Sequence, residues 1–399
     1  MRRQLAITLV LWVVALASLA QAQSLLHGPQ GVSCDTAGRR FFVTDFLDGN
    51  VIQIDSNDVE SYFLTGLGSC MYSTIDDDVL YVSSAIGIMG VSLSTGDKLL
   101  TVTIPGTGRL AGVAVDTSGF LYTVDSFARR IHRIRLADAA CSTIVSAGLP
   151  FFPEALFFDG ERNRLLLTSD LQQPIMNTLI VSVDLPSGAL TTVATAPFGW
   201  CEGITRDRRG YWYITDWAYG RIFAFDSAFS NPPRIVDSGY EGPTGLCYDV
   251  LRDRLMIPEF KTNDVRLLEI RDADRDGSPD FYDDCTDVDG DGFGDPGFSG
   301  NSCLLDNCPT VTNPTQTDAD SDGFGDACCC LGVRGNVNYL GIVDLADLSA
   351  LVSFLTGGGY RLPCPNEANV NGNGVVDLSD LSSLVSYLTG GGYVLPNCS

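Results

Sequence analysis

The sequence predicts a mainly β protein: a six-bladed β-propeller, then a loop-rich acidic segment and a small α-helical domain. Three observations support this prediction. One pattern of apolar runs recurs six times between residues 24 and 271, 15 Asp residues crowd into residues 272–330, and a loop–helix motif is duplicated after residue 331. We therefore expect domains at 23–271, 272–330 and 331–399, after a short N-terminal leader at 1–22.

Composition excludes several classes of protein. The chain has 399 residues, a net charge of -24 and two histidines, His27 and His132. So few histidines argue against a histidine-based catalytic triad or a His-ligated zinc site. Nucleic acid is excluded as a partner because a polyanion repels so acidic a protein. The 13 cysteines favour an oxidising compartment.

The N-terminus predicts export. Arg2 and Arg3 precede an apolar run at 5–19, which is followed by Ala20-Gln21-Ala22. This order of charge, apolar run and small residues is typical of a signal peptide, cleaved here after Ala22. The alternative is a membrane anchor, but spanning a bilayer takes roughly 20 apolar residues and this run is shorter. We expect a secreted or extracellular protein, either free or associated with the cell surface.

The six repeats consist of short runs rich in β-branched and aromatic residues, bounded by Gly, Asp or Asn, which is typical of strands. GVAVD at 112–116 and LYTVD at 121–125 are examples of the first and second runs. Five repeats have a fourth run. The sixth lacks one, and we expect 24–26 to supply it and close the ring. Radial repetition leaves few free sheet edges, which favours a propeller over a sandwich.

These repeats resemble those of the NHL and gluconolactonase-like six-bladed propellers. In such a fold the starts of the first strands and the ends of the second strands lie on one face. Carboxylates beside aromatic side chains on that face suit sugars or cations. The residues that we select as ligand-binding are Glu154, Glu202, Trp200, Trp217, Asp216 and Glu259. An acid at a strand end also commonly caps its own turn, so this alternative stays open for Asp216 and Glu259.

The same resemblance implies an alternative function. Gluconolactonase-like enzymes hold a divalent metal in the channel with one Glu, two Asn and one Asp. The matching inner positions here are Gln30, Met71, Ala111, Glu154, Glu202 and Thr244. They include no Asn, and Met71 and Ala111 cannot coordinate a metal, which argues against an enzyme. Catalysis would fall to Glu154 and Glu202 alone.

Calcium sites are predicted within residues 272–330. Asp at alternate positions before Gly places several carboxylates around one hard cation. The ligands predicted in the three successive loops are Asp272, Asp274, Asp276, Asp280 and Asp283; Asp287, Asp289, Asp291 and Asp295; and Asp318, Asp320, Asp322 and Asp326. The last two loops lack an acid at position 12, so a neighbouring motif or water must complete their shells. With almost no apolar core, this segment must fold around its cations.

The segment resembles thrombospondin type 3 repeats, most specifically in DNCP…N-x-x-Q-x-D-x-D-x-D-G-x-G-D-x-C from Asp306 to Cys328. A disordered acidic linker is the alternative, but random acidic tracts do not place Gly and Cys in this order. Cysteine order and the resemblance together suggest two disulfides, Cys285–Cys303 and Cys308–Cys328. Sequence alone does not fix connectivity, and it leaves open the pairing of the propeller cysteines and of Cys329, Cys330, Cys364 and Cys398.

Residues 335–363 are repeated as 368–396, and each copy is predicted to be a loop followed by a helix. Two matching apolar stripes are expected to pack the helices on each other. The stripes are Leu345, Leu348, Val352 and Leu355, and Leu378, Leu381, Val385 and Leu388.

This duplication resembles dockerin modules, whose paired calcium loops are similar to half EF-hands. The ligands that the resemblance implies are Asn336, Asn338, Asp344 and Asp347 in the first loop, and Asn369, Asn371, Asn373, Asp377 and Asp380 in the second. Leu340 stands at position 5 of the first loop and cannot coordinate, so calcium binding there stays open. A plain two-helix tail is the alternative.

Dockerins bind cohesins, so the resemblance implies a cohesin-like protein or cell-surface scaffold as partner, contacted through Leu345-Ala346 and Leu378-Ser379. We expect a secreted calcium-binding protein whose propeller binds an extracellular glycan or protein and whose tail tethers it. An extracellular lactonase or other hydrolase with a channel metal is the alternative.

Overall fold

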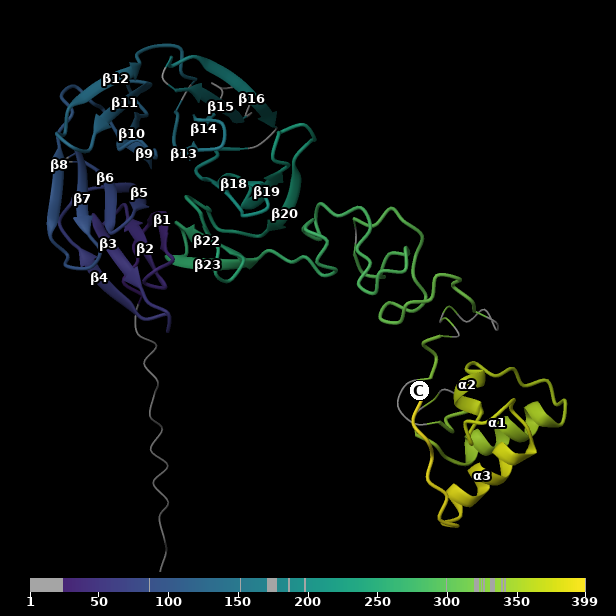
Figure 1. Cartoon of the computed structure of the whole chain (residues 1–399). Helices are drawn as coiled ribbons and strands as arrows, with labels where there is room; N and C mark the ends of the chain where they lie inside the picture. Colours follow the sequence, from purple (N-terminus) through teal and green to yellow (C-terminus); the bar gives the residue numbers. More distant parts are fainter. Residues whose placement is uncertain are drawn as a thin grey trace, which may run out of the picture.

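The computed structural model describes residues 24–398, apart from 86, 151, 171–177, 186, 197–198, 299, 319–322, 324, 326, 331–333, 339 and 341. The predicted signal peptide lies outside the described residues, as do three of the predicted calcium ligands, Asp320, Asp322 and Asp326. Figure 1 shows three successive parts: a ring of sheets, a loop-rich segment and a small helical module.

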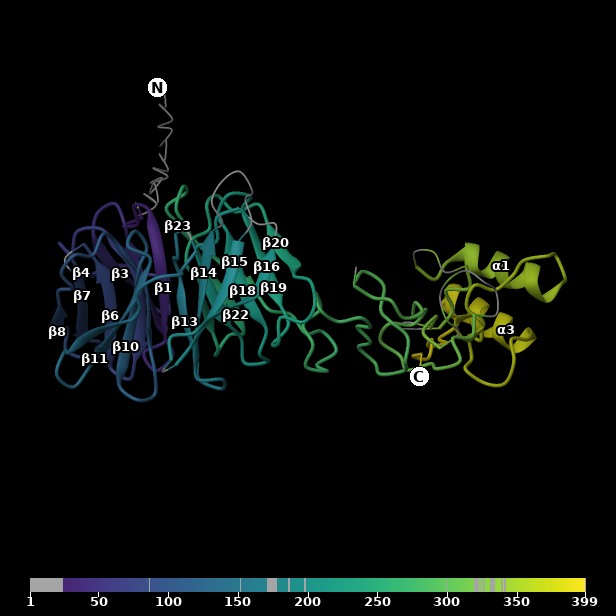
Figure 2. The ribbon, with the colours of Figure 1, turned by 90° about the horizontal axis from the view of Figure 1, so that it is seen from above.

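Six antiparallel sheets surround a central axis, so the predicted six-bladed propeller is confirmed (Figures 1 and 2). The first three blades are β1 (Pro29–Asp35), β2 (Arg40–Asp45), β3 (Asn50–Ile54) and β4 (Glu60–Leu64); β5 (Cys70–Asp76), β6 (Val79–Ser84), β7 (Gly87–Ser92) and β8 (Lys98–Val102); and β9 (Leu110–Val115), β10 (Phe120–Asp125), β11 (Arg130–Arg135) and β12 (Cys141–Val145). The others are β13 (Leu156–Asp159), β14 (Arg164–Asp170), β15 (Thr178–Asp184) and β16 (Leu190–Ala196); β17 (Ile204–Arg206), β18 (Trp212–Asp216), β19 (Arg221–Phe225) and β20 (Arg234–Ser238); and β21 (Cys247–Asp249), β22 (Arg254–Glu259) and β23 (Asp264–Glu269).

The sixth blade has three strands, and the expectation that residues 24–26 would add a fourth is wrong. Leu26 is buried between the first and last blades, where its neighbours include Val32 and Met256. Ser24 is held elsewhere, because its hydroxyl donates to the carboxylate of Glu60 at 3.0 Å. The short apolar run therefore fills the seam between blades as packing material.

Hydroxyl side chains of the second strands lock neighbouring blades together. They donate to backbone carbonyls at the start of the next blade: Thr44 to Met71 at 2.7 Å, Ser83 to Ala111 at 2.6 Å and Thr215 to Thr244 at 2.6 Å. All three hydroxyl residues are fully buried. A buried hydroxyl is costly without a partner, so these three bonds hold the starts of the second, third and sixth blades at a defined depth beside the channel.

The ring closes through contacts between the first and sixth blades. The Gly245 amide donates to the Gln30 carbonyl at 2.7 Å, and the Thr244 hydroxyl donates to the Pro29 carbonyl at 3.0 Å. A disulfide joins Cys34 on β1 to Cys247 on β21. This covalent link spans 213 residues of sequence and ties the two ends of the propeller to each other.

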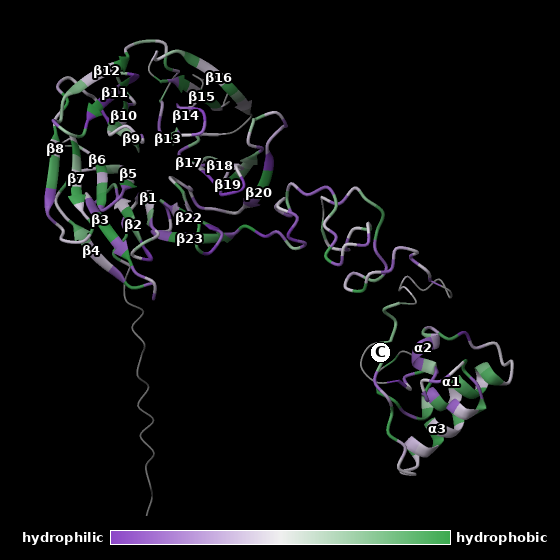
Figure 3. Ribbon diagram, in the orientation of Figure 1, coloured by the Kyte–Doolittle hydropathy of each residue, from purple (hydrophilic) through white to green (hydrophobic). Residues whose placement is uncertain are grey.

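Residues 272–330, called the acidic segment below, contain no helix and no strand among the residues described there. Figure 3 shows a largely hydrophilic ribbon along this part of the chain. The segment begins against the fifth blade, where Phe281 and Tyr282 pack beside Tyr211 and the Tyr282 hydroxyl donates to the Ala224 carbonyl at 3.1 Å. The predicted disulfides Cys285–Cys303 and Cys308–Cys328 are both confirmed.

The C-terminal module (residues 334–398) contains α1 (Leu345–Leu355), α2 (Pro365–Ala368) and α3 (Leu378–Leu388), with α1 and α3 in contact. Two further disulfides, Cys329–Cys364 and Cys330–Cys398, bind the module to the end of the acidic segment.

The predicted apolar stripes are partly wrong. Leu345 and Leu378 are each 71% exposed, whereas Leu351 and Leu384 are fully buried. The buried face of each helix is therefore rotated by about one position from the predicted one. The reason is that the core of the module also includes the loop residues Val337 and Val370, which draw the adjacent side of each helix inward.

Five disulfides join ten of the described cysteines in pairs, which suggests an extracellular or secreted protein. Among the residues that the structure describes, no helix combines the length and the apolar character needed to cross a membrane.

Candidate functional site

The central channel ends, where the first strands begin, in a cluster of polar side chains that we call the channel mouth: Gln30, Tyr72, Arg109, Glu154 and Glu202. Glu202 accepts hydrogen bonds on its carboxylate from the Gln30 amide at 2.8 Å and from the Tyr72 hydroxyl at 3.1 Å. The Tyr72 hydroxyl also contacts the backbone carbonyl of Glu202. Because blades 1, 2 and 5 supply these groups, the side chain of Tyr72 crosses the channel.

Glu154 and Arg109 form an ion pair beside this crossing. The Arg109 guanidinium donates to the Glu154 carboxylate at 2.8 Å, and Glu154 is 5% exposed. Burial raises the pKa of Glu202, while Arg109, Tyr72 and Gln30 oppose this rise. The channel mouth thus holds one carboxylate paired with Arg109 and a second, that of Glu202, which accepts from two neutral donors and is also stabilised by the charge of Arg109.

The sequence-based choice of inner positions identified the two glutamates and missed Tyr72 and Arg109. Met71 and Ala111, which occupy the corresponding positions on blades 2 and 3, are buried. Tyr72 follows Met71 directly, and Arg109 stands two residues before Ala111. Tyr72 and Arg109 have long side chains that reach the channel from one or two positions away from the aligned residues. An alignment of the repeats compares backbone positions and does not show how far a side chain reaches.

We expect Tyr72→Phe to raise the pKa of Glu202 further. The substitution removes a hydroxyl that stabilises the ionised carboxylate while keeping the ring that crosses the channel. Carbon-13 NMR titration of the glutamate carboxyl groups would measure the shift, with Tyr62→Phe, at an exposed ring, as the control. An unchanged or lowered pKa would show that the hydroxyl does not act on Glu202.

Arg109→Gln should lower the free energy of unfolding by about 1–3 kcal/mol, because it leaves the buried Glu154 carboxylate without its charged partner. Arg135→Gln is the matched control. Arg135 pairs with Asp138 at 3.4 Å in a setting where both side chains are more than half exposed, so its loss should cost under about 0.5 kcal/mol. Urea unfolding of the two variants would compare them, and equal losses would contradict the pairing.

Asp216 and Glu259 face into their own blades. Asp216 is fully buried, and Arg221 donates to its carboxylate at 2.7 Å. Glu259 is 4% exposed and accepts from the Glu241 amide at 2.7 Å. Asp216 also accepts from the Tyr219 amide at 3.2 Å, which matches the turn-capping alternative. Glu259 instead holds the loop before the sixth blade against the end of β22.

Trp200 and Trp217 lie together on the same face as the channel mouth. Their ring centroids are 5.4 Å apart, and the Trp217 amide donates to the Trp200 carbonyl at 2.7 Å. The Lys261 ammonium lies 4.6 Å from the centroid of Trp217, whereas Trp200 is 46% exposed. The pair therefore presents one open aromatic surface, that of Trp200, beside the loop that carries Glu202.

The acidic segment gathers two sets of predicted calcium ligands. Carboxylate oxygens of Asp272, Asp274 and Asp276 lie within 4.8 Å of one another, and the same holds for Asp287, Asp289 and Asp291. Calcium prefers oxygen ligands. The carboxylates within each cluster repel one another unless a cation lies between them.

Several buried oxygens in these loops have no hydrogen-bond donor, and a bound cation would satisfy them. Both carboxylate oxygens of Asp289 are of this kind, as is one oxygen each of Asp272, Asp283 and Asp295. Burial raises the pKa of Asp289, and the neighbouring carboxylates raise it further, beginning with Asp291. A buried carboxylate without a donor is costly in free energy, so the donor set fits a hard divalent cation.

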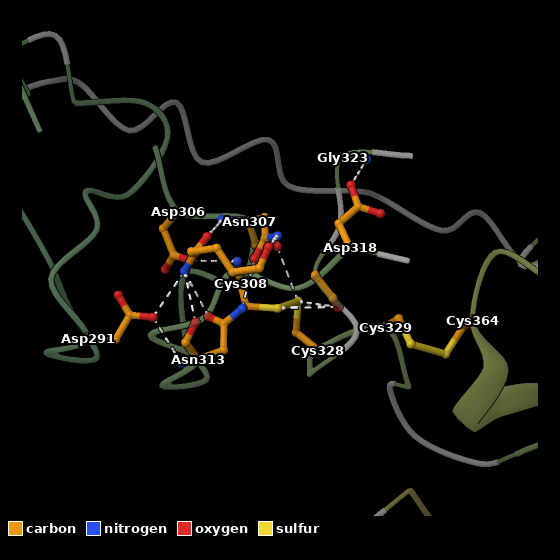
Figure 4. Close-up of a disulfide and its surroundings, with 12 residues drawn as sticks. Asp291, Asp306, Asn307, Cys308, Asn313, Asp318, Gly323, Cys328, Cys329 and Cys364 are labelled. Atoms are coloured by element: carbon orange, nitrogen blue, oxygen red, sulfur yellow. Dashed lines mark hydrogen bonds between the residues drawn. A yellow bond between two sulfur atoms is a disulfide. The ribbon is translucent and has the colours of Figure 1, made fainter. Parts of the chain in front are cut away.

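Asp306 is a further oxygen donor that the sequence-based ligand set omitted. It is 3% exposed, and one of its carboxylate oxygens is buried with no donor, while the other accepts from the Gln316 amide at 2.8 Å (Figure 4). Its amide donates to the Gly294 carbonyl at 2.8 Å, which holds it next to Asp295. Asp306 is thus a candidate for the acid that the second loop lacks at position 12, since its carboxylate lies close enough to raise the pKa of both Asp289 and Asp295. The sequence did contain a signal for this residue, because Asp306 is the first residue of the DNCP motif.

The other predicted ligands of this segment take different places. Asp280 accepts from the Ala273 amide at 2.7 Å, which closes the first loop. Asp318 accepts from the Gly323 amide at 3.0 Å, as drawn in Figure 4. The remaining ligands of the third loop lie outside the described residues.

The two loops of the C-terminal module are built alike. Asp344 and Asp377 cap the N-termini of α1 and α3, and Asp347 and Asp380, three residues later, complete a capping box in each helix. Both of the latter are fully buried and accept from a loop amide, Asn338 at 3.0 Å and Asn371 at 2.9 Å. The last acid of each loop is thereby directed back toward the loop.

The Asn residues of these loops are less uniform. Asn369 has a buried side-chain oxygen without a donor, whereas Asn371 donates to the Ser379 hydroxyl at 2.6 Å and accepts from the Asn373 amide at 2.7 Å. In the first loop, the Leu340 amide donates to the side-chain oxygens of Asn336 and Asn338. Among the described residues of the two loops, the buried Asn oxygen without a donor is that of Asn369, in the second loop.

Comparison with known proteins supports the propeller fold but assigns no activity or ligand. No protein-family model and no curated protein matches this sequence. A protein of unknown function from Bacteroides thetaiotaomicron matches with a TM-score of 0.54 and 14% identity, covering 61% of this chain and 70% of that one. A gluconolactonase from Xanthomonas campestris matches with a TM-score of 0.52 and 16% identity, covering 61% and 86%. Hydrazine synthase from Kuenenia stuttgartiensis matches with a TM-score of 0.50 and 12% identity, covering 63% and 98%. At such low identity these similarities show a shared propeller fold alone.

Proposed function

We propose that this chain is a secreted calcium-binding modular protein. The observation that carries the proposal is the set of buried carboxylate oxygens without donors in the acidic segment, centred on Asp289. Bound calcium would supply positive charge that draws the aspartates together. Residues 272–295 with Asp306 would hold two ions, and the resemblance to thrombospondin type 3 repeats and the two confirmed disulfides agree with this reading.

The propeller, in this proposal, binds an extracellular glycan or protein at the face that carries the channel mouth. Support comes from exposed aromatic rings, such as Trp200, on the same face as the carboxylates of Glu154 and Glu202. Aromatic rings stack on sugar rings, and carboxylates accept hydrogen bonds from their hydroxyls.

A glycan array probed with the calcium-loaded full chain tests this proposal. Trp200→Ala should abolish or sharply weaken the signal, and Tyr62→Ala, which removes an exposed ring from the outer strand β4, should not. Absence of any glycan signal from the unaltered chain would contradict glycan binding and leave a protein as the ligand to be sought.

The C-terminal module would tether the protein to a cohesin-like protein or cell-surface scaffold. Leu345 and Leu378, at equivalent positions of the duplicated helices, are each 71% exposed, which suits residues that contact a partner. Gel filtration with purified cohesin modules, comparing the unaltered chain with the Leu345→Asp/Leu378→Asp double variant, tests the tether. No co-elution of the unaltered chain with any cohesin would contradict it.

A lactonase-type hydrolase with a divalent metal in the channel is the second candidate. The direction of the pKa shift of Glu202 favours it, since burial raises the pKa of this carboxyl group and a raised pKa suits a general acid. Against it, Glu154 pairs with Arg109 and Glu202 with Tyr72 and Gln30. Lactone hydrolysis that depends on added metal and is lost in Glu202→Gln would establish the enzyme.

A further inference from the structure

The second loop of the C-terminal module contains two consecutive Asn-Gly pairs, Asn371-Gly372 and Asn373-Gly374, and this pair occurs nowhere else in the sequence. In such a pair the backbone nitrogen of the glycine can attack the side-chain carbonyl of the asparagine, because glycine has no side chain to hinder the approach. Asparagine counts among the thermally labile residues. The loop therefore combines predicted calcium ligands with a sequence that is prone to lose an amide.

Hydrogen bonds restrain the first of these pairs. The Gly372 amide donates to the Asn369 carbonyl at 3.0 Å, so the attacking nitrogen is engaged. The half-buried Asn371 side chain donates to the Ser379 hydroxyl at 2.6 Å and accepts from the Asn373 amide at 2.7 Å. An attack on Asn371 must break several of these bonds first.

The second pair lacks comparable restraints. Asn373 and Gly374 are both exposed. Among the residues that the structure describes, the Gly374 amide donates to no acceptor, and the Asn373 side chain makes one hydrogen bond, to the Asn371 carbonyl at 3.0 Å. The φ angles of Gly372 and Gly374 are 71° and 72°, so the two glycines do not differ in this angle. Hydrogen bonding and exposure distinguish the two pairs.

We propose that Asn373 is a site of spontaneous deamidation, which changes the charge of the second loop. The Gly374 nitrogen attacks the side-chain carbon Cγ of Asn373, the bond from Cγ to Nδ2 breaks, and ammonia leaves with the proton of the Gly374 nitrogen. Water then opens the resulting five-membered imide at either of its carbonyl groups. One opening gives aspartate at this position, and the other gives isoaspartate, in which the backbone runs through Cγ.

The two products have opposite effects on a calcium loop. Asn373 stands at position 5, and the side chains at positions 1 and 3, Asn369 and Asn371, are neutral as well. Calcium loops gain affinity with the charge of their ligands, so an aspartate at position 5 strengthens binding. Isoaspartate lengthens the backbone by one carbon and displaces the carboxylate, so the ion loses a ligand. This effect on calcium rests on the proposed function, whereas deamidation itself does not.

Peptide mapping by mass spectrometry tests the assignment, after incubation of the full chain in heavy-oxygen water to label the carboxyl groups that form. The product at Asn373 should accumulate at least roughly tenfold faster than that at Asn371, because the hydrogen bonds of the first pair must break before attack. A peptide of residues 368–378 is the unstructured reference, in which both asparagines should react at similar rates. Asn57, which is exposed and followed by Asp58, controls for exposure alone and should stay intact.

Two variants separate the effect of structure from that of sequence. Ser379→Ala removes the hydroxyl that holds Asn371, and it should speed deamidation there severalfold while leaving the rate at Asn373 unchanged. Asn373→Gln should stop the reaction at this position, because the longer side chain would have to close a six-membered ring. Equal rates at the two asparagines of the unaltered chain, or a faster reaction at Asn371, would overturn the assignment.

Asn373→Asp reproduces the aspartate product. In a calcium titration followed by the amide NMR signal of Gly374, this variant should bind roughly three- to tenfold more tightly than the unaltered chain. Bound calcium should also slow deamidation, since an ion that holds the Asn373 oxygen keeps the side chain away from the Gly374 nitrogen. Deamidation at Asn373 without any response of Gly374 to calcium would keep the modification and contradict calcium binding by the second loop.

Discussion

Asp289→Asn is expected to weaken calcium binding at the second loop of the acidic segment by at least roughly tenfold. Both carboxylate oxygens of Asp289 are buried without a donor, so the loop depends on a cation to satisfy them. An amide keeps the shape of the side chain while removing its charge and one oxygen. The binding deficit should appear as one weakened site in a calcium titration followed by calorimetry, with the other sites retained.

Asp284→Asn is the matched control for this variant. Asp284 belongs to the same segment, but its side chain is 76% exposed and pairs with Arg234 at 3.2 Å. Its replacement should leave every calcium site within about twofold. Should Asp289→Asn and Asp284→Asn behave alike, the aspartate cluster would not be a calcium site.

Removal of the Cys34–Cys247 disulfide is expected to cost the propeller about 5 kcal/mol of unfolding free energy. The bond closes a loop of 213 residues, and the chain-entropy model assigns a long loop a large constraint on the unfolded state. The sixth blade has only three strands, so few other contacts compensate for an open ring. Urea unfolding of the Cys34→Ser/Cys247→Ser double variant at constant calcium would measure the loss.

Cys141→Ser controls for the chemistry of the substitution, because Cys141 is an exposed cysteine outside any disulfide. Its replacement should change the unfolding free energy by less than about 0.5 kcal/mol. A double variant within 1 kcal/mol of the unaltered chain would mean that ring closure relies on the hydrogen bonds of Gly245 and Thr244 instead.

The sequence was sufficient to predict the propeller because its strand pattern repeats six times and each copy supports the others. The disulfides of the acidic segment were predictable for a related reason, since Cys308 and Cys328 stand at fixed places in a spaced motif. The helix stripes were less predictable. Leu345 and Leu351 are equally apolar, and only the position of loop residues such as Val337 determines which of them is buried.

The channel mouth could be predicted only in part. Glu154 and Glu202 were identified because a carboxylate at the start of a strand is conspicuous. Tyr72 and Arg109 were missed because reaching the channel depends on side-chain length and on a strand irregularity between Cys70 and Ser73. Asp306 was missed because it lies eight residues beyond the expected position 12 of the second loop. The additional residues include Cys303, and the regular loop spacing therefore did not connect Asp306 to Asp295.

Limited proteolysis of the full chain with and without a calcium chelator, with fragments identified by mass, tests the central claim most directly. With calcium present, the chain should resist cleavage throughout residues 24–398. With calcium removed, cleavage should concentrate between 272 and 330, while the propeller fragment survives. Equal resistance of residues 272–330 in both conditions would contradict a segment built around calcium.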